Sequence, residues 1–210
     1  MKNNIVVALT KGRILNESLP LLAQAGIEPI ESTITTRKLL LDTNEQNIKL
    51  AILRGADVPT YVRHGAADLG IVGKDVLLEY GSEGIYEAAD LGIATCKLMT
   101  AGMVNASAAE GRLRVATKFV NISRTYFSKK SKQVDIVKLF GALELAPIMG
   151  LADVIVDIVD TGDTLRANGL VPFEEILSIS SRLIVNKAFV RKNNAFLLRF
   201  LDALMSKKNE

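Results

Sequence analysis

The chain has 210 residues, of which 49% are hydrophobic and 23% are charged, a balance that is typical of a globular protein and excludes a disordered one. The formal net charge is only +3 and the Lys and Arg residues are dispersed, so nucleic acid is not an expected partner. Cys96 and His64 are the single cysteine and histidine, which excludes an internal disulfide, argues against a structural zinc site and fits a reducing compartment. No apolar run approaches the roughly 18 residues of a membrane-spanning helix, and residues 5–9 are too few for the core of a signal peptide. We therefore expect a cytoplasmic protein without membrane contact.

Short apolar runs alternate along the chain with segments of helical periodicity. The expected strands are residues 5–9, 48–53, 68–72, 113–116, 134–137 and 154–158, followed by a long β-like stretch over 176–185. The expected helices are residues 15–25, 58–64, 75–80, 123–128 and 165–168, with an amphipathic terminal helix over 194–205. This alternation predicts an α/β fold with mostly parallel sheets flanked by helices.

Two of the expected strands begin with a similar sequence. Residues 67–72 read Ala-Asp-Leu-Gly-Ile-Val and residues 152–156 read Ala-Asp-Val-Ile-Val. Each leads into a turn and a helix, so we interpret the pair as a sign of two similar α/β lobes. The alternative is that any two buried strands look alike, because such strands are near-continuous apolar runs.

The strand over residues 154–158 leads into a turn rich in acids and hydroxyls, which begins at Asp157 and continues through Asp160, Thr161, Gly162, Asp163, Thr164 and Leu165. A helical pattern follows at once, so the turn offers free backbone N–H groups and the positive end of a helix dipole to a phosphate. Thr161 and Thr164 add hydroxyl donors, and Gly162 lets the backbone approach an anion closely. The acids would repel a bare phosphate but suit a ligand that also carries hydroxyls or Mg²⁺, such as a ribose 5-phosphate. The alternative is a capped helix start, because Asp and Thr are good N-caps.

From Glu144 through this turn the chain resembles the ATP phosphoribosyltransferase family. The family signature is matched at Glu144, Gly150, Ala152, Ile155, Asp157, Ile158, Thr161, Gly162, Thr164 and Leu165. Further matches lie in residues 9–13, 36–39, 53–59, 65–75 and 165–170. The resemblance implies a two-lobed fold of periplasmic-binding-protein type II, in which the first lobe is discontinuous (1–93 plus 178–210). The second lobe (94–177) would carry the phosphoribosyl-binding loop.

The resemblance also implies a glycosyltransferase activity, of the pentosyltransferase kind. N1 of the adenine of ATP would attack C1 of 5-phosphoribosyl 1-pyrophosphate and release pyrophosphate, as the first step of histidine biosynthesis. We expect Arg13 and Arg37 to be catalytic, because arginine contacts phosphate oxygens in pairs and the departing pyrophosphate gains negative charge. Lys11 and Arg54 would assist in binding ATP or pyrophosphate. Each of these cations has a structural alternative as a solvated or ion-paired surface residue.

In the second lobe, Glu144 and Asp157 would hold ribose hydroxyls or Mg²⁺-linked water. The 5-phosphate would lie in the turn, against Asp160, Thr161, Gly162, Asp163, Thr164 and Leu165. Mg²⁺ would arrive on the substrates, since it usually rides on substrate phosphates, and we expect no dedicated metal site in the protein.

The length of the chain resembles the short form of the family. That form works with a separate regulatory subunit similar to histidyl-tRNA synthetase, so the resemblance implies this hetero-oligomer as well as a homodimer. Two other functions stay open at this point. One is a small-ligand-binding module of the same fold, because fold alone does not fix function. The other is a salvage-type phosphoribosyltransferase, although such enzymes usually have two adjacent acids and two residues separate Asp157 from Asp160.

Overall fold

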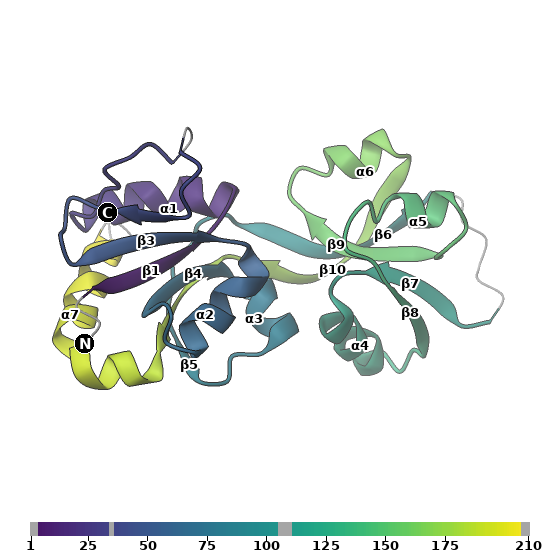
Figure 1. The fold of residues 1–210 in the computed structure, drawn as a ribbon. Coiled ribbons are helices and arrows are strands. Elements are labelled where there is room, and N and C mark those ends of the chain that lie inside the picture. Colours follow the sequence, from purple (N-terminus) through teal and green to yellow (C-terminus); the bar gives the residue numbers. More distant parts are fainter. Residues whose placement is uncertain (1–3, 34–35, 105–110, 207–210) are drawn as a thin grey trace. The chain divides into compact units, whose positions relative to one another are not determined.

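The structure is a computed structural model that describes residues 4–33, 36–104 and 111–206 (Figure 1). Its contacts divide the chain into two compact units. Unit 1 contains the residues up to Ala94 and those from Ser180 onward, and unit 2 is Thr95–Ile179. The lobe limits expected from the resemblance, after residues 93 and 177, lie next to these positions.

Unit 1 is a six-stranded sheet covered on both faces by helices. Its strand order is β2-β3-β1-β4-β11-β5. The strands are β1 (Ile5–Thr10), β2 (Leu40–Asp42), β3 (Ile48–Leu53), β4 (Leu69–Gly73), β5 (Ile85–Asp90) and β11 (Ser181–Asn186). The helices are α1 (Arg13–Gln24), the short 3-10 helix η1 (Gly55–Asp57), α2 (Val58–Arg63), α3 (Lys74–Tyr80) and α7 (Lys187–Met205).

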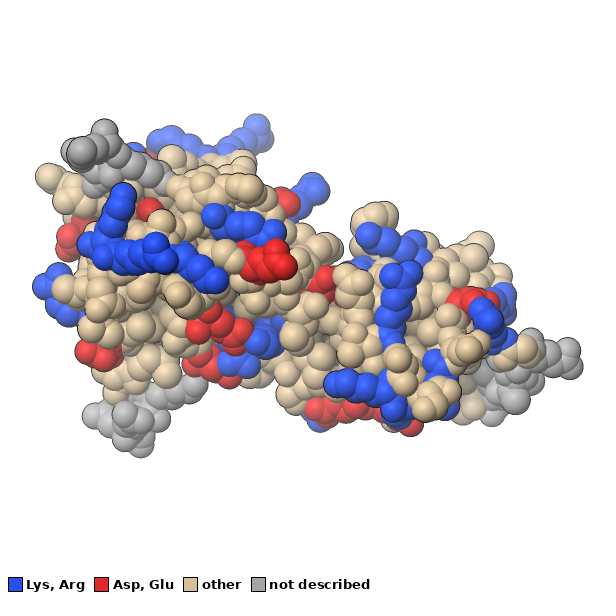
Figure 2. Space-filling model, turned by 90° about the horizontal axis from the view of Figure 1, so that it is seen from below, with Lys and Arg blue, Asp and Glu red and all other residues tan. Residues whose placement is uncertain are grey.

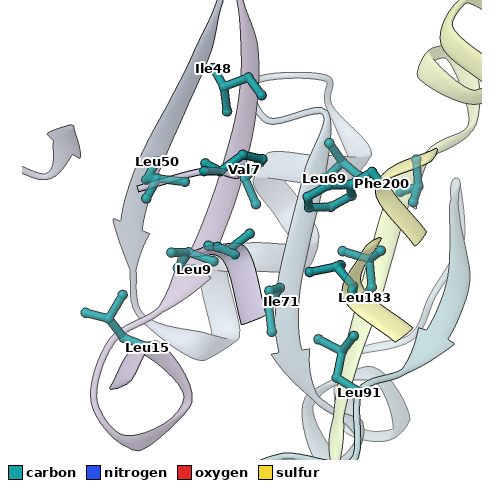
Figure 3. Close-up of a cluster of buried hydrophobic side chains, with 14 of the residues drawn as sticks. Val7, Leu9, Leu15, Ile48, Leu50, Leu69, Ile71, Leu91, Leu183 and Phe200 are labelled. Carbon is teal, nitrogen blue, oxygen red and sulfur yellow. The ribbon is translucent and has the colours of Figure 1, made fainter. Parts of the chain in front are cut away.

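The side chains of each strand in unit 1 alternate between the two faces of the sheet, which explains why the unit has two hydrophobic clusters. Val7 and Leu9 of β1 join the cluster formed with α1 and α7, where Phe200 packs near Leu69 and Leu183 (Figure 3). The intervening residues of β1 point to the opposite face and pack with α2 and α3. Because successive side chains of a strand point to opposite faces, a strand covered on both sides must be apolar at every position. This is why residues 5–9 form an unbroken apolar run.

Unit 2 is a five-stranded sheet with the strand order β10-β6-β9-β7-β8. Its strands are β6 (Cys96–Met103), β7 (Leu113–Thr117), β8 (Val134–Lys138), β9 (Val154–Val159) and β10 (Leu170–Ile179). Its helices are α4 (Val120–Lys129), α5 (Leu145–Ile148) and α6 (Asp163–Ala167). Residues of α5 and α6 pack on one face of the sheet and those of α4 on the other.

The repeated Ala-Asp pattern marks equivalent positions in the two sheets. In unit 1 the Asp68 carboxylate accepts the N–H of Val6 at 2.9 Å, and the N–H of Asp68 donates to the Val6 carbonyl at 2.8 Å. In unit 2 Asp153 makes the same two hydrogen bonds with Arg114, at 2.8 and 2.9 Å. Each aspartate thus fixes the start of one parallel strand against its neighbour. The two units are therefore similar in how these equivalent strands begin, as the repeated sequence predicted.

The prediction of mostly parallel sheets was wrong, because both sheets are mixed. The pairs β1–β3, β1–β4, β7–β8 and β7–β9 are parallel, whereas β2, β5, β6, β10 and β11 pair antiparallel to their neighbours. Parallel pairing needs a crossover long enough for a helix. The chain instead passes between the units on short connections, from β5 to β6 and from β10 to β11.

Those connections also explain an error in one expected element. The stretch over residues 176–185 is two strands in different sheets, which meet at Ser180. The apolar pattern continues across Ser180, so it contains no signal that the chain changes sheet there. The strands β2, β5 and β6 and the helix α5 were not predicted.

Helix α7 begins earlier than expected. The side chain of Asn186 caps it by accepting the N–H groups of Ala188 and Phe189, and the helix is kinked at Asn193. The predicted helix over residues 194–205 is the part after the kink. Among the described residues, no helix is both long and apolar enough to cross a bilayer.

Candidate functional site

A cavity of about 370 Å³ lies at the carboxyl end of β9 in unit 2. It is lined by Lys118, Glu144 and the continuous segment 157–165. The strands β7 and β9 are parallel and adjacent, with Thr117 opposite Val156, so Lys118 comes from the strand end beside Asp157. All the second-lobe residues that were predicted to bind the ligand therefore line one cavity.

Hydrogen bonds within the turn hold its shape. Gly162 has φ 77°, in the left-handed region that favours glycine. The hydroxyl of Thr161 donates to the Asp163 carboxylate at 2.6 Å and accepts the Asp163 N–H at 3.3 Å. Arg166 donates to the Thr161 carbonyl at 3.0 Å and to the Asp163 carboxylate at 2.5 Å. These contacts order the loop between β9 and α6 within the chain itself.

The two ends of this segment differ in electrostatics. The hydrogen bond from Thr161 and the charge of Arg166 lower the pKa of Asp163, which is exposed. Burial raises the pKa of Asp157, and the charge of Glu144 raises it further. Lys118, with its Nζ 3.4 Å from Asp157 Oδ1, and the N–H of Ile158, at 2.8 Å, oppose the rise. A desolvated carboxylate with a specific charged partner in a cavity is typical of a functional site.

The four cations expected from the first lobe lie in unit 1. Lys11 and Arg54 follow the adjacent parallel strands β1 and β3, and the N–H of Lys11 donates to the Leu53 carbonyl at 2.8 Å. Arg13 begins α1 and its Nε lies 2.7 Å from Glu17. Arg37 lies in the segment before β2, and all four side chains are exposed. On the face drawn in Figure 2, basic and acidic side chains occur together on each unit, as their dispersion in the sequence suggested.

Comparison with known proteins decides the family. A family model described as HisG, ATP phosphoribosyltransferase, matches residues 54–206. The chain belongs to the ATP phosphoribosyltransferase family. It is 58% identical over 200 residues to the ATP phosphoribosyltransferases of Pseudomonas putida and Ectopseudomonas mendocina, with 95% of each chain covered.

A solved structure of the family has the same fold. The chain is similar to the ATP phosphoribosyl transferase (HisG:HisZ) complex from Thermotoga maritima, with a TM-score of 0.82 and 33% identity. The likeness covers 96% of this chain and 97% of that one. The chain therefore has the two-lobed α/β fold of periplasmic-binding-protein type II, with mixed sheets flanked by helices.

The carboxylates in the cavity can act as hydrogen-bond acceptors for a ligand. In the described part of the chain, no group of three or more His, Cys, Asp and Glu side chains is placed to hold a metal ion. Glu144 and Asp157 line the cavity together with a lysine. The two carboxylates can accept hydrogen bonds from hydroxyls or from the water shell of a Mg²⁺ ion that rides on a diphosphate.

Sequence reasoning missed Lys118. The strand before it was predicted, and the carboxyl ends of parallel strands meet at one edge of a sheet, where ligands bind in open α/β folds. Applied to residues 113–116 and 154–158 together, this rule places the residues after both strands at the same site. The rule thus gives a signal for Lys118 in the sequence, but only the structure shows that β7 and β9 are neighbours.

Proposed function

We propose that this chain is the catalytic subunit of an ATP phosphoribosyltransferase, which joins ATP to 5-phosphoribosyl 1-pyrophosphate in the first step of histidine biosynthesis. Family membership and relatives of 58% identity that bear this name support the proposal. The observation that carries it is the cavity of unit 2, because its lining is Glu144 and the family-matching turn at residues 157–165.

The turn would bind the phosphoribosyl group in two parts. Thr161, Gly162 and Thr164 would hold the 5-phosphate, and Asp157 and Glu144 would accept hydrogen bonds from the ribose hydroxyls. Asp160 and Asp163 also line the cavity. The ion pair of Asp163 with Arg166 reduces its repulsion of a phosphate. Leu165 is buried in the core of unit 2, so it would anchor the turn.

The reaction forms the bond between N1 of the adenine and C1 of the ribose as the bond from C1 to the pyrophosphate oxygen breaks. The bonding electrons leave with pyrophosphate, so its negative charge grows. Arg13 and Arg37 are our candidates for stabilising that charge, with Lys11 and Arg54 assisting in binding ATP or pyrophosphate. Mg²⁺ on the diphosphate would offset part of the same charge.

The proposal includes partners. The related Thermotoga maritima protein is described in a HisG:HisZ complex, and we propose that this chain joins a regulatory subunit similar to histidyl-tRNA synthetase. A homodimer of the catalytic chain and a cytoplasmic location complete the proposal.

The test is pyrophosphate release by the purified chain, with and without the regulatory subunit. Release should require ATP and phosphoribosyl pyrophosphate together, and free nucleobases should not replace ATP. Release with a nucleobase but not with ATP would instead identify a salvage-type enzyme. No release, combined with tight binding of an unrelated small ligand, would indicate a binding module.

A further inference from the structure

The cavity of unit 2 has an unusual charge balance for a site that would bind phosphate. Its lining contains four carboxylates, from Glu144, Asp157, Asp160 and Asp163. Among the described lining residues, Lys118 is the single cation. Asp163 is offset from outside the lining by Arg166, and Lys118 contacts Asp157 from within the lining.

The backbone around Lys118 is fixed directly opposite Asp157. The neighbouring Thr117 is fully buried. Its hydroxyl donates to the carbonyl of Val156 on β9 at 2.7 Å and accepts the N–H of Phe119 at 2.9 Å. The Thr117 hydroxyl therefore links Val156, which precedes Asp157, to Phe119. Thr117 and Phe119 are the two chain neighbours of Lys118.

The contact between the two charges is close but leaves Lys118 capacity for a ligand. Lys118 Nζ lies 3.4 Å from Asp157 Oδ1 and 4.9 Å from the centroid of the Phe119 ring. Strong charge-assisted hydrogen bonds measure about 2.7–2.9 Å. An ammonium has three N–H donors, and the Lys118 side chain is 41% exposed. It can thus stabilise the carboxylate and still donate to a ligand oxygen.

We infer that Lys118 is a positioning residue of this site, whose ammonium holds Asp157 as the carboxylate that accepts hydrogen bonds from the ribose hydroxyls. The inference rests on the proposed function of the cavity. Its physical basis is that an opposite charge within a few ångströms favours the ionised form, whereas burial favours the neutral one. Lys118 lowers the pKa of Asp157 against the effect of burial.

The other charged groups around Asp157 do not replace Lys118. Glu144, from the start of α5, raises the pKa of Asp157 further, and Asp160 shares the cavity with the same sign of charge. On β6 the residue opposite Asp157 is the uncharged Met99. The nearest basic position along that strand, Lys97, is paired with Glu175 at 2.7 Å.

The direct test is the pKa of Asp157, measured from the pH dependence of its carboxyl carbon signal by NMR. Lys118→Met removes the charge and keeps an unbranched chain, so the pKa of Asp157 should rise. Lys118→Arg restores a cation and should keep the pKa near the wild-type value. Lys129→Met, on the exposed end of α4, is the matched control and should change nothing. An unchanged pKa in Lys118→Met would overturn the inference, and Lys118→Gln serves the same purpose if the Met variant does not fold.

A kinetic measurement links this effect to function. In Lys118→Met, kcat/KM for phosphoribosyl pyrophosphate should fall on the order of tenfold at pH values where Asp157 is ionised in the wild type but protonated in the variant, and by a smaller factor at alkaline pH, where Asp157 ionises without help. A loss of equal size at every pH would contradict the positioning role. If the wild-type chain released no pyrophosphate, the proposed function would fail. The NMR measurement would still decide whether Lys118 controls Asp157.

Discussion

Asp157 is a carboxylate held where water cannot fully solvate it. Burial raises its pKa above the ordinary value of 3.8, so its ionised form destabilises the folded state relative to an unfolded chain in which it is solvated. A group with a raised pKa favours folding fully below its unfolded pKa, and this contribution disappears as the pH rises through the folded pKa. Above its folded pKa, Asp157 therefore carries a charge that the fold tolerates and that the ligand would use.

Replacing the Asp157 carboxylate by an uncharged group should raise the stability of the fold and reduce activity. Asp157→Asn should raise Tm at neutral and alkaline pH, by about 2–4 °C for each kcal/mol gained in a chain of this size. The difference from the wild type should shrink as the pH falls and should vanish below 3.8, where both chains are uncharged at this position in the folded and unfolded states. Binding of phosphoribosyl pyrophosphate should weaken. Calorimetric unfolding across pH measures the first effect, and a Tm below that of the wild type at every pH would contradict it.

The arginines of unit 1 lead to a separate prediction. Arg13→Ala and Arg37→Ala should each lower kcat by roughly 10²–10³-fold, the usual loss when one donor to a developing charge is removed, with smaller changes in substrate binding. Removing Arg13 also breaks its pair with Glu17, but exposed pairs of this kind contribute little to stability. Steady-state kinetics beside Arg191→Ala, an exposed control on α7, tests the roles. Wild-type kcat in both variants would exclude them.

At the residue level, what the sequence could predict depended on local pattern. The acids and hydroxyls of the turn are consecutive in the chain, so they could be read as one site. Lys118 and Asp157 are far apart in sequence and meet only because β7 and β9 are parallel neighbours. The pairing of Arg13 with Glu17 is a side-chain choice that spacing permits but does not determine.

At the level of elements, the loop between β9 and α6 depends on the left-handed conformation of Gly162. A Cβ there would lie 3.1 Å from Arg166 Nη1, so a side chain would both strain the backbone and push against the arginine that orders the loop. Gly169, which follows α6, has a similar φ of 72° but open space around it. A comparison of substitutions at the two glycines therefore distinguishes the cost of backbone strain, which both share, from a disturbance of the Arg166 contact, which only Gly162 would cause.

Both Gly162→Ala and Gly169→Ala should cost about 1–2 kcal/mol, the strain of a left-handed residue with a side chain. Only Gly162→Ala should also weaken binding of phosphoribosyl pyrophosphate strongly, because it alone lines the cavity. Denaturant unfolding and titration calorimetry measure the two quantities. Equal binding by the two variants would show that the turn does not hold the ligand.

Elements with strong periodicity were predicted well, and elements defined by long-range pairing were not. Ile48–Leu53 was predicted with the bounds that the structure has, because an apolar run covered on both faces carries its own signal. The three-residue strand β2 exists only through its pairing with β3. β10 contains two register shifts and many exposed residues, so its alternation is broken, and its boundary with β11 has no signal in the local pattern.

For the whole molecule, the two units repeat one arrangement. In both, two parallel pairs are followed by an antiparallel strand, as β3-β1-β4-β11 and β8-β7-β9-β6. The duplicated Ala-Asp start of β4 and β9 gave the one local sign of this repeat in the sequence. The mixed pairing could not be predicted, because strand direction depends on how the chain passes between the units.

The whole molecule is expected to assemble with a second copy of itself and with the regulatory subunit. The purified chain should have a solution mass twice that of one chain, and adding the regulatory subunit should produce a larger complex with a higher rate of pyrophosphate release. Light scattering after size-exclusion chromatography measures the masses. A monomer that neither binds the subunit nor changes its rate would refute the proposed assembly.

The most direct test of the central claim is a crystal structure with phosphoribosyl pyrophosphate and Mg²⁺ bound. The 5-phosphate should lie on the turn formed by residues 161–164, with the ribose hydroxyls hydrogen-bonded to Asp157 and Glu144. The pyrophosphate should point away from the turn. A sugar phosphate bound outside the cavity of unit 2, or a pyrophosphate group occupying the turn in place of the 5-phosphate, would contradict the claim.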